Sequence, residues 1–105
     1  MQERRKNKRK LVNSRIMVYH SVVSVFESRT KDISNSGVRI SVNEDYTDKI
    51  HEKDSAKVVF LNSGDVTLIF NMIVIRVSKD EIAMEILNCE RNGKVFPVSD
   101  LREAF

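Results

Sequence analysis

Six of the seven residues between positions 4 and 10 are basic, and only Asn7 interrupts them. Within this run Arg5 and Arg9 stand four residues apart in the sequence RKNKR. Arginine presents a planar fork of N–H donors that pairs with phosphate or with the O6/N7 edge of guanine, and it can stack on a base. The run is therefore suited to binding a nucleotide, although basic runs also occur as solvated, nonspecific arms.

A second candidate stretch is KDISNSGVR at positions 31–39, in which Asp32, Ser34 and Gly37 form the pattern D-x-S-x-x-G. Carboxylate and hydroxyl groups can hydrogen-bond a ligand, and glycine allows a close backbone approach. The same composition is typical of an ordinary turn, in which Asp and Ser bond nearby backbone and Gly takes the left-handed conformation. We expect a turn between two strands in either case.

The sequence offers little for catalysis or for metal binding. His20 and His51 are the only histidines, neither has a second ligand at metal-binding spacing, and the single cysteine, Cys89, is distant from both. There is no glycine-rich phosphate loop and no nucleophile elbow. We therefore expect no enzymatic activity, no catalytic residue, no metal and no cofactor, with structural or solvated histidines and a partly buried Cys89.

Length and composition indicate the class of protein that carries these groups. The 105 residues suit one domain, and 41 % apolar with 31 % charged residues is typical of a soluble globular chain. No apolar run reaches the roughly 18 residues of a membrane span, and a lone cysteine fits a reducing compartment, so we expect a cytoplasmic protein without membrane insertion.

The positive charge is concentrated at the N-terminus. Residues 1–10 carry six basic groups and one acid, a net charge of +5, so the rest of the chain contributes −2 to the total of +3. Proteins that coat DNA more often spread basic residues over a face of the fold. We therefore expect a basic arm at residues 1–10, joined to a mildly acidic domain at residues 11–105.

Strand signals dominate this domain. β-branched and aromatic residues gather in six segments, at positions 15–20, 22–26, 38–42, 57–61, 66–77 and 81–87. Several alternate, as where Val38, Ile40 and Val42 share one face. The glycines fall between strand candidates or at the end of one, and the polar residues 43–55 are expected to be a surface loop. Six short strands with tight turns indicate an antiparallel barrel or sandwich.

The spacing of apolar residues changes near the C-terminus. Val98, Leu101, Ala104 and Phe105 fall at helical spacing, and Ser99 is a suitable N-cap. A helix this short is not stable alone, so we expect it to dock its apolar stripe on the strands.

The arginine pair and the D-x-S-x-x-G pattern are more specific together than apart. R-x-x-x-R followed about 20–30 residues later by D-x-S-x-x-G, in a small all-β chain, resembles the PilZ domain family, whose members bind the bacterial second messenger cyclic di-GMP. The resemblance implies a six-stranded antiparallel β-barrel with a short C-terminal helix. It matches Arg5 and Arg9 to the arginine pair, and Asp32, Ser34 and Gly37 to the second motif. Arg4, directly before the pair, implies binding of a stacked cyclic di-GMP dimer.

On this resemblance we expect a bacterial, non-enzymatic cyclic di-GMP receptor that signals to an unidentified downstream protein. Arg5 and Arg9 would clamp the ligand against the turn, and Asp32 would accept hydrogen bonds from N1 and N2 of a guanine.

Two other functions stay open. The chain could be a small β-barrel that binds RNA or single-stranded DNA through its basic arm, or an adaptor that binds only protein. The nucleic-acid alternative expects exposed aromatic residues for base stacking, and the seven aromatic residues here fall mostly on apolar-patterned positions. We therefore regard nucleic acid as the less favoured partner.

Overall fold

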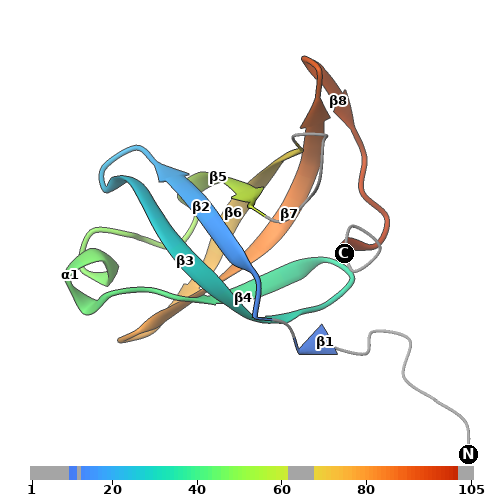
Figure 1. Cartoon of the computed structure of the whole chain (residues 1–105). Coiled ribbons are helices and arrows are strands. Elements are labelled where there is room, and N and C mark those ends of the chain that lie inside the picture. The colour runs from blue at the N-terminus through green and yellow to red at the C-terminus, as the bar shows by residue number, and fades with distance from the viewer. Residues whose placement is uncertain (1–9, 12, 62–67, 102–105) are drawn as a thin grey trace, which may run out of the picture.

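The computed structural model describes residues 10–11, 13–61 and 68–101, which form eight strands and one single-turn helix. In chain order they are β1 (Lys10–Leu11), β2 (Arg15–His20), β3 (Ser24–Ile33), β4 (Gly37–Ser41), α1 (Glu44–Thr47), β5 (Ser55–Phe60), β6 (Ile69–Val77), β7 (Glu81–Arg91) and β8 (Lys94–Phe96). The single helix of the described residues is a loop turn at one end of the barrel, and the strands supply most of the core (Figure 1).

The strands close into a barrel. Antiparallel pairing runs β2–β3–β4–β7–β6–β5 and returns from β5 to β2, so each of these six strands has a partner on both edges. The short β1 adds to β3, and β8 extends β7 as a hairpin that stands away from the barrel (Figure 1). The predicted six-stranded antiparallel barrel is confirmed.

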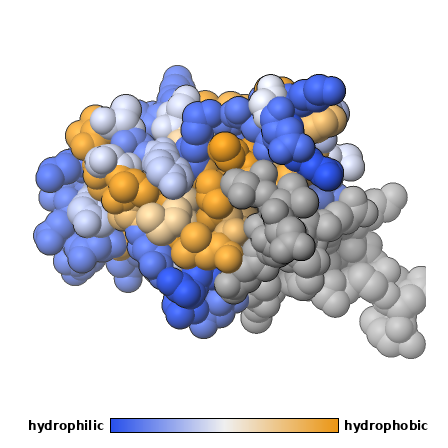
Figure 2. All heavy atoms as spheres, turned by 45° about the horizontal axis from the view of Figure 1, so that its top comes forward, coloured by the Kyte–Doolittle hydropathy of each residue, from blue (hydrophilic) through white to orange (hydrophobic). Residues whose placement is uncertain are grey.

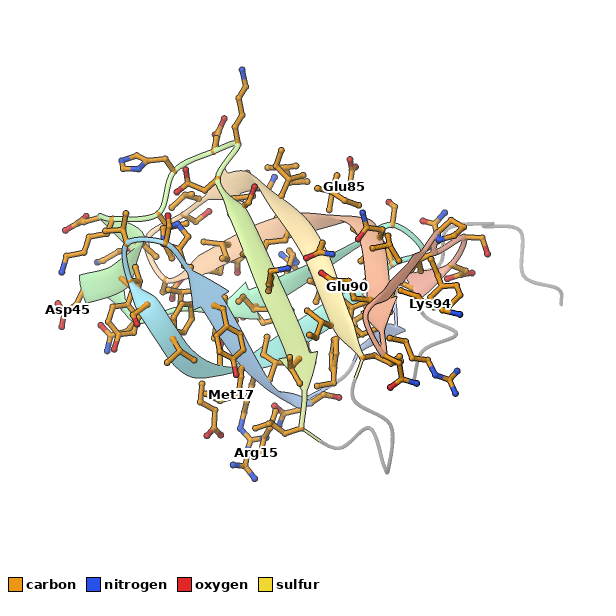
Figure 3. All side chains as sticks on the ribbon, turned by 90° about the horizontal axis from the view of Figure 1, so that it is seen from above. Arg15, Met17, Asp45, Glu85, Glu90 and Lys94 are labelled. Carbon is orange, nitrogen blue, oxygen red and sulfur yellow. The ribbon has the colours of Figure 1, made fainter. Side chains whose placement is uncertain are left out.

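Alternation along the strands fills the barrel. Val38, Ile40 and Val42 are all buried, as their spacing predicts, and Phe70 and Met72 of β6 are buried in the same core. Side chains at the intervening positions project outward, as Figure 3 shows for Arg15 and Met17 on β2. The same view places Asp45 of α1 and Lys94 of β8 at opposite ends of the molecule. None of the helices in the described residues has the length and apolar character that a membrane crossing requires.

Three details differ from the sequence-based expectations. The second strand is longer than predicted, because β3 continues through polar residues to Ile33, and the prediction missed β8. The segment at 43–55 is not wholly a loop, since the Asn43 side chain accepts the Asp45 N–H and starts α1. Ile50, in the same segment, is buried.

The predicted C-terminal helix is not confirmed. Residues 98–100 are not helical, and Leu101, the last described residue, has 3₁₀ conformation. Ala104 and Phe105 lie outside the described residues, as do Gly64 and the start of the predicted strand at 66–77.

Candidate functional site

The D-x-S-x-x-G stretch forms the tight turn between β3 and β4, called here the motif turn (residues 32–37). The Ser34 N–H donates to the Gly37 carbonyl at 2.9 Å, and the Gly37 N–H donates to Ser34 Oγ at 3.2 Å. Ser34 therefore closes the turn through both its backbone and its hydroxyl group. Serine at this position fixes the shape of the surface that the turn presents.

Gly37 is needed for space and not for a left-handed backbone. Its φ is not positive, unlike that of Gly93 at 80°, so the expected left-handed conformation at Gly37 is wrong. A Cβ atom on Gly37 would lie 2.6 Å from the Met84 carbonyl oxygen, closer than real Cβ contacts occur. The expected close backbone approach is present, and its partner is β7. Gly37 lets the motif turn sit directly against this strand.

A β-bulge in β3 decides where Asp32 points. Thr30 pairs with Ile40 and Asp32 pairs with Arg39, so Lys31 is one residue more than β4 can match. Strict alternation would place Asp32 on the same inner face as Thr30, whereas the bulge turns it to the face of Arg39. Cross-strand neighbours on one face interact directly. The bulge thus brings an acid and a base together at the start of the motif turn.

Asp32 and Arg39 form a close ion pair. Arg39 donates to Asp32 Oδ2 from Nη2 at 2.6 Å and from Nε at 3.0 Å. The Asp32 side chain is 3 % exposed, while that of Arg39 is 36 % exposed. A carboxylate this buried requires a charged partner. Arg39 was not among the residues selected from the sequence, although a basic residue two positions after Gly37 was a usable signal.

Glu81 and Lys31 extend the pair into a network. Arg39 Nη1 lies 3.4 Å from Glu81 Oε2, and Lys31 Nζ donates to Glu81 Oε1 at 2.9 Å. The hydrogen bond from Lys31 lowers the pKa of Glu81, and the hydrogen bond to Asp32 raises the pKa of Arg39. Both groups therefore stay charged at neutral pH. Arg39 is held from two sides, and its side chain stays partly exposed.

The motif turn is also hydrogen-bonded to β7 and to the last described residue of the chain. The Leu101 N–H donates to the Asn35 carbonyl at 2.7 Å, and the Ile86 N–H donates to the Ser36 carbonyl at 2.8 Å. Leu101 itself is fully buried. β7 and the C-terminal segment thus support the motif turn from behind, which makes it a rigid surface.

The predicted arm residues Arg4, Arg5 and Arg9 lie outside the described residues. What the structure does show is where the chain enters the barrel after them. Lys10 pairs with Ile33 and Leu11 pairs with Asp32. The residue that follows Arg9 in sequence is therefore hydrogen-bonded beside the motif turn. Asp32, Ser34 and Gly37 are brought together by the fold, and β1 joins them to the arm.

The remaining chemical groups have structural surroundings. His20 Nε2 lies 2.8 Å from Asp54 Oδ2, and His20 Nδ1 accepts the Val22 and Val23 N–H groups at 3.1 and 3.2 Å. His20 thus joins the β2–β3 turn to the loop before β5, as the expected structural role implies. Cys89 is buried, and burial raises the pKa of its thiol. Within the described ranges, no three His, Cys, Asp or Glu side chains are grouped to hold a metal.

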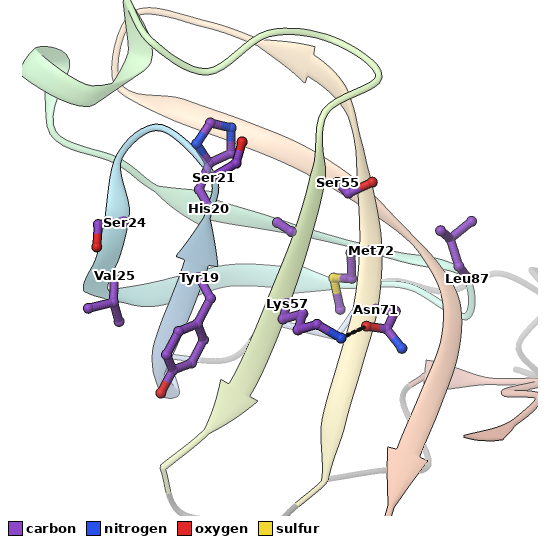
Figure 4. Close-up of a pocket in the computed structure, with 11 residues that line it drawn as sticks. Tyr19, His20, Ser21, Ser24, Val25, Ser55, Lys57, Asn71, Met72 and Leu87 are labelled. Carbon is purple, nitrogen blue, oxygen red and sulfur yellow. Dashed lines mark hydrogen bonds between the residues drawn. The ribbon is translucent and has the colours of Figure 1, made fainter. Parts of the chain in front are cut away.

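A groove of about 630 Å³ lies elsewhere on the barrel, across β3, β2, β5, β6 and β7 (Figure 4). Tyr19 and Leu87 stand on its sides, and Lys57 Nζ donates to Asn71 Oδ1 at 2.8 Å between them. Figure 2 shows apolar side chains gathered on the upper face of the molecule with hydrophilic ones around them. No residue of the motif turn lines this groove.

Most aromatic side chains of the described residues lie in the core or pack against it, as expected. Phe26, Phe60 and Phe70 are buried, whereas Tyr19 and Phe96 are 47 % and 45 % exposed. These two lie on β2 and β8 and do not form a pair with each other or with another described ring. The described strands thus lack the row of stacked aromatic residues that single-stranded nucleic-acid binding favours.

Comparison with known proteins agrees with the barrel fold. Among solved structures the chain is similar to the inhibitor of motility MotI/DgrA of Bacillus subtilis, with a TM-score of 0.61 and 14 % sequence identity. The match covers 81 % of this chain and 43 % of that protein, so the chain spans less than half of its length. No curated protein matches the chain. The PilZ domain model matches residues 3–94, which include both the arginine pair and the motif turn. The chain therefore belongs to the PilZ domain family, a family of cyclic di-GMP receptors.

Proposed function

We propose that this PilZ domain is a bacterial, cytoplasmic and non-enzymatic receptor for cyclic di-GMP. In this proposal Arg4, Arg5 and Arg9 of the basic arm bind the ligand against Asp32, Ser34 and Gly37 of the motif turn. The observation that carries the proposal is the pairing of β1 with β3, because it attaches the arm beside the turn. Family membership supplies the ligand class.

The two halves of the proposed site have different physical properties. The motif turn is preorganised by the Ser34–Gly37 hydrogen bonds, by the Asp32–Arg39 ion pair and by its contact with β7. A preorganised surface loses little conformational entropy when a ligand binds. The arm supplies the charge, because cyclic di-GMP carries two phosphates and residues 11–105 alone have a net charge of −2.

Signalling follows from the same arrangement. Binding holds the ligand between arm and turn, which fixes the position of the arm and so changes the surface that the domain offers to a downstream protein. Cyclic di-GMP is bound and released unchanged, and no metal or cofactor takes part.

Calorimetric titration tests the proposal. The chain is titrated separately with cyclic di-GMP, with GTP and with a short single-stranded oligonucleotide at one salt concentration. Saturable binding of cyclic di-GMP alone is the expected result. Equal or tighter binding of the oligonucleotide would favour the nucleic-acid alternative, and binding of none of the three would favour a protein-only adaptor.

A further inference from the structure

One edge of β3 is covered by a neighbouring strand along only part of its length. β2 pairs with β3 from Ser24 onward on one edge. On the other edge the pairing with β4 extends only over Thr30–Ile33. After Ser41 the chain leaves β3 and continues to α1 (Figure 1). The first half of β3 therefore has a strand on one side only.

The hydrogen bonds of β3 show which backbone groups point to this open edge. The Thr30 N–H donates to the Ser14 carbonyl, on the side of β2, at 3.0 Å. Backbone groups of successive residues point to opposite edges of an antiparallel strand, so those of Val25 and Glu27 point away from β2. Among the residues that the structure describes, none hydrogen-bonds the backbone of Val25 or Glu27. The open edge thus presents two N–H donors and two carbonyl acceptors.

The open edge also has space beside it. A cavity of about 520 Å³ lies where β3 and the chain after β4 separate. Glu27 and Ser28 line it from β3, and Ser41, Val42 and Asn43 line it from the other side. The Ser28 hydroxyl donates to the Ser41 carbonyl and marks the point at which the two segments part. Another segment of extended chain can therefore lie next to β3 beyond this bond.

The side chains at the open edge indicate what such a segment should carry. Val25 lies directly opposite Tyr19 of β2, and their side chains are 45 % and 47 % exposed. Figure 4 shows the two residues on adjacent strands. Cross-strand neighbours on one face of a sheet stabilise each other, and apolar pairs do so by contact. An added strand with an apolar residue opposite Val25 would continue this row onto a third strand.

A second copy of the chain is a poor match for the same edge. In a twofold antiparallel register that uses both residues, Val25 of one copy lies opposite Glu27 of the other. A register centred on Glu27 places two carboxylates directly opposite each other, which is destabilising. A register centred on Val25 pairs that residue alone, because the next position falls in the β2–β3 turn. The edge therefore favours a different polypeptide.

We propose that the edge of β3 at Val25 and Glu27 is a docking site for an extended segment of another protein. The segment adds a strand to β3 through backbone hydrogen bonds and places an apolar side chain opposite Val25. This edge lies at the other end of β3 from the motif turn and includes none of the residues assigned to the nucleotide. The inference goes beyond the proposed function and does not depend on it.

Amide hydrogen exchange of the full chain tests the open edge. The amides of Val25 and Glu27 should exchange about tenfold faster or more than that of Phe26, which faces β2. Equal protection at the three positions would overturn the inference. Sedimentation of the wild type should give a monomer. A dimer that is lost in Val25→Pro would assign the edge to a second copy and would also overturn it.

A phage-displayed library of random dodecapeptides, selected on the full chain, tests the occupant. The selected peptides should slow exchange of the Val25 and Glu27 amides. Val25→Pro should weaken their binding about tenfold or more, because it removes an N–H donor and blocks a neighbouring strand. Val25→Ile is the matched control, since it keeps the N–H and the apolar side chain, and should bind like the wild type. Peptides that bind Val25→Pro as well as the wild type would overturn the proposal.

Thermal melting reports whether Val25→Pro is folded, as expected for a proline whose nitrogen faces away from the ladder. Backbone N-methylation of a selected peptide gives a test that leaves the protein unchanged. Methyl groups should abolish binding at alternate peptide positions only, because every second N–H of an added strand faces β3. A peptide that tolerates methylation at every position, or a library that yields no binder, would overturn the proposal.

Discussion

In the basic arm, arginine and lysine carry the same charge but different donor geometry. Arg5→Ala and Arg9→Ala should each weaken cyclic di-GMP binding by about 1.5–3 kcal/mol, because each removes a charge-assisted contact with a planar fork. Lys6→Ala and Lys8→Ala remove the same charge without a fork and should cost much less. Calorimetry of the four variants at one salt concentration provides the measurement. Equal losses in all four would mean that the arm acts only as a diffuse positive charge.

At Gly37 the packing of the motif turn depends on the absence of a Cβ atom. Gly37→Ala should lower the free energy of unfolding by about 1–3 kcal/mol, the usual cost of overpacking, because the new Cβ atom meets the Met84 carbonyl. Gly93→Asn is the matched control, since Gly93 has open space around it and asparagine tolerates a positive φ. Urea unfolding of both variants checks the difference. An unchanged midpoint for Gly37→Ala would show that β7 can move aside.

The sequence indicated part of this site and not the rest. Asp32, Ser34 and Gly37 could be predicted to share one turn because they are close in the chain. Arg39 could not be paired with Asp32 from alternation, because strict alternation points Asp32 to the inner face. Only the bulge at Lys31 reverses that direction, and a bulge of this kind leaves no clear mark in composition.

At the scale of elements, alternation and turn residues were sufficient to predict six strands in an antiparallel barrel or sandwich, and the family resemblance selected the barrel. They failed where side chains carry no burial signal. The second half of β3 is polar, and all three residues of β8 are exposed, so neither showed the alternation of a half-buried strand. α1 was predictable in principle from Asn43, whose side chain caps it.

The loop before β5 is one element whose stability should depend on pH. The His51 N–H and the His20 side chain, in that order, lower the pKa of Asp54 below its ordinary 3.8. Because the folded-state pKa is the lower one, the charged carboxylate stabilises the fold above that ordinary value, and this contribution is lost as pH falls through the folded-state pKa. Urea unfolding between pH 7 and pH 3 should show a smaller acid loss in Asp54→Asn than in the wild type. Parallel curves would contradict the assignment.

At the scale of the whole molecule, the concentration of positive charge in the basic arm predicts how many cyclic di-GMP molecules each chain binds. Two intercalated cyclic di-GMP molecules present four phosphates and stacked guanines, and Arg4 adds a third fork next to Arg5. The wild type should bind about two ligands per chain, with an affinity that falls steeply as salt is added. Arg4→Ala should shift the stoichiometry toward one without abolishing binding. A calorimetric wild-type titration that saturates at one ligand would exclude the dimer and keep the receptor.

Under the proposed function, the pairing of β1 with β3 makes the encounter between the arm and a ligand on the motif turn an intramolecular event. A short tether of this kind holds its free end at an effective concentration in the millimolar range. A synthetic peptide of residues 1–9, added to the Arg5→Ala/Arg9→Ala chain, should therefore restore cyclic di-GMP binding only at millimolar peptide. Restoration at micromolar peptide would show that the arm has a high affinity of its own. If millimolar peptide is required, the covalent attachment of the arm beside the motif turn, more than the arm's intrinsic affinity, sets the second-messenger concentration to which the domain responds.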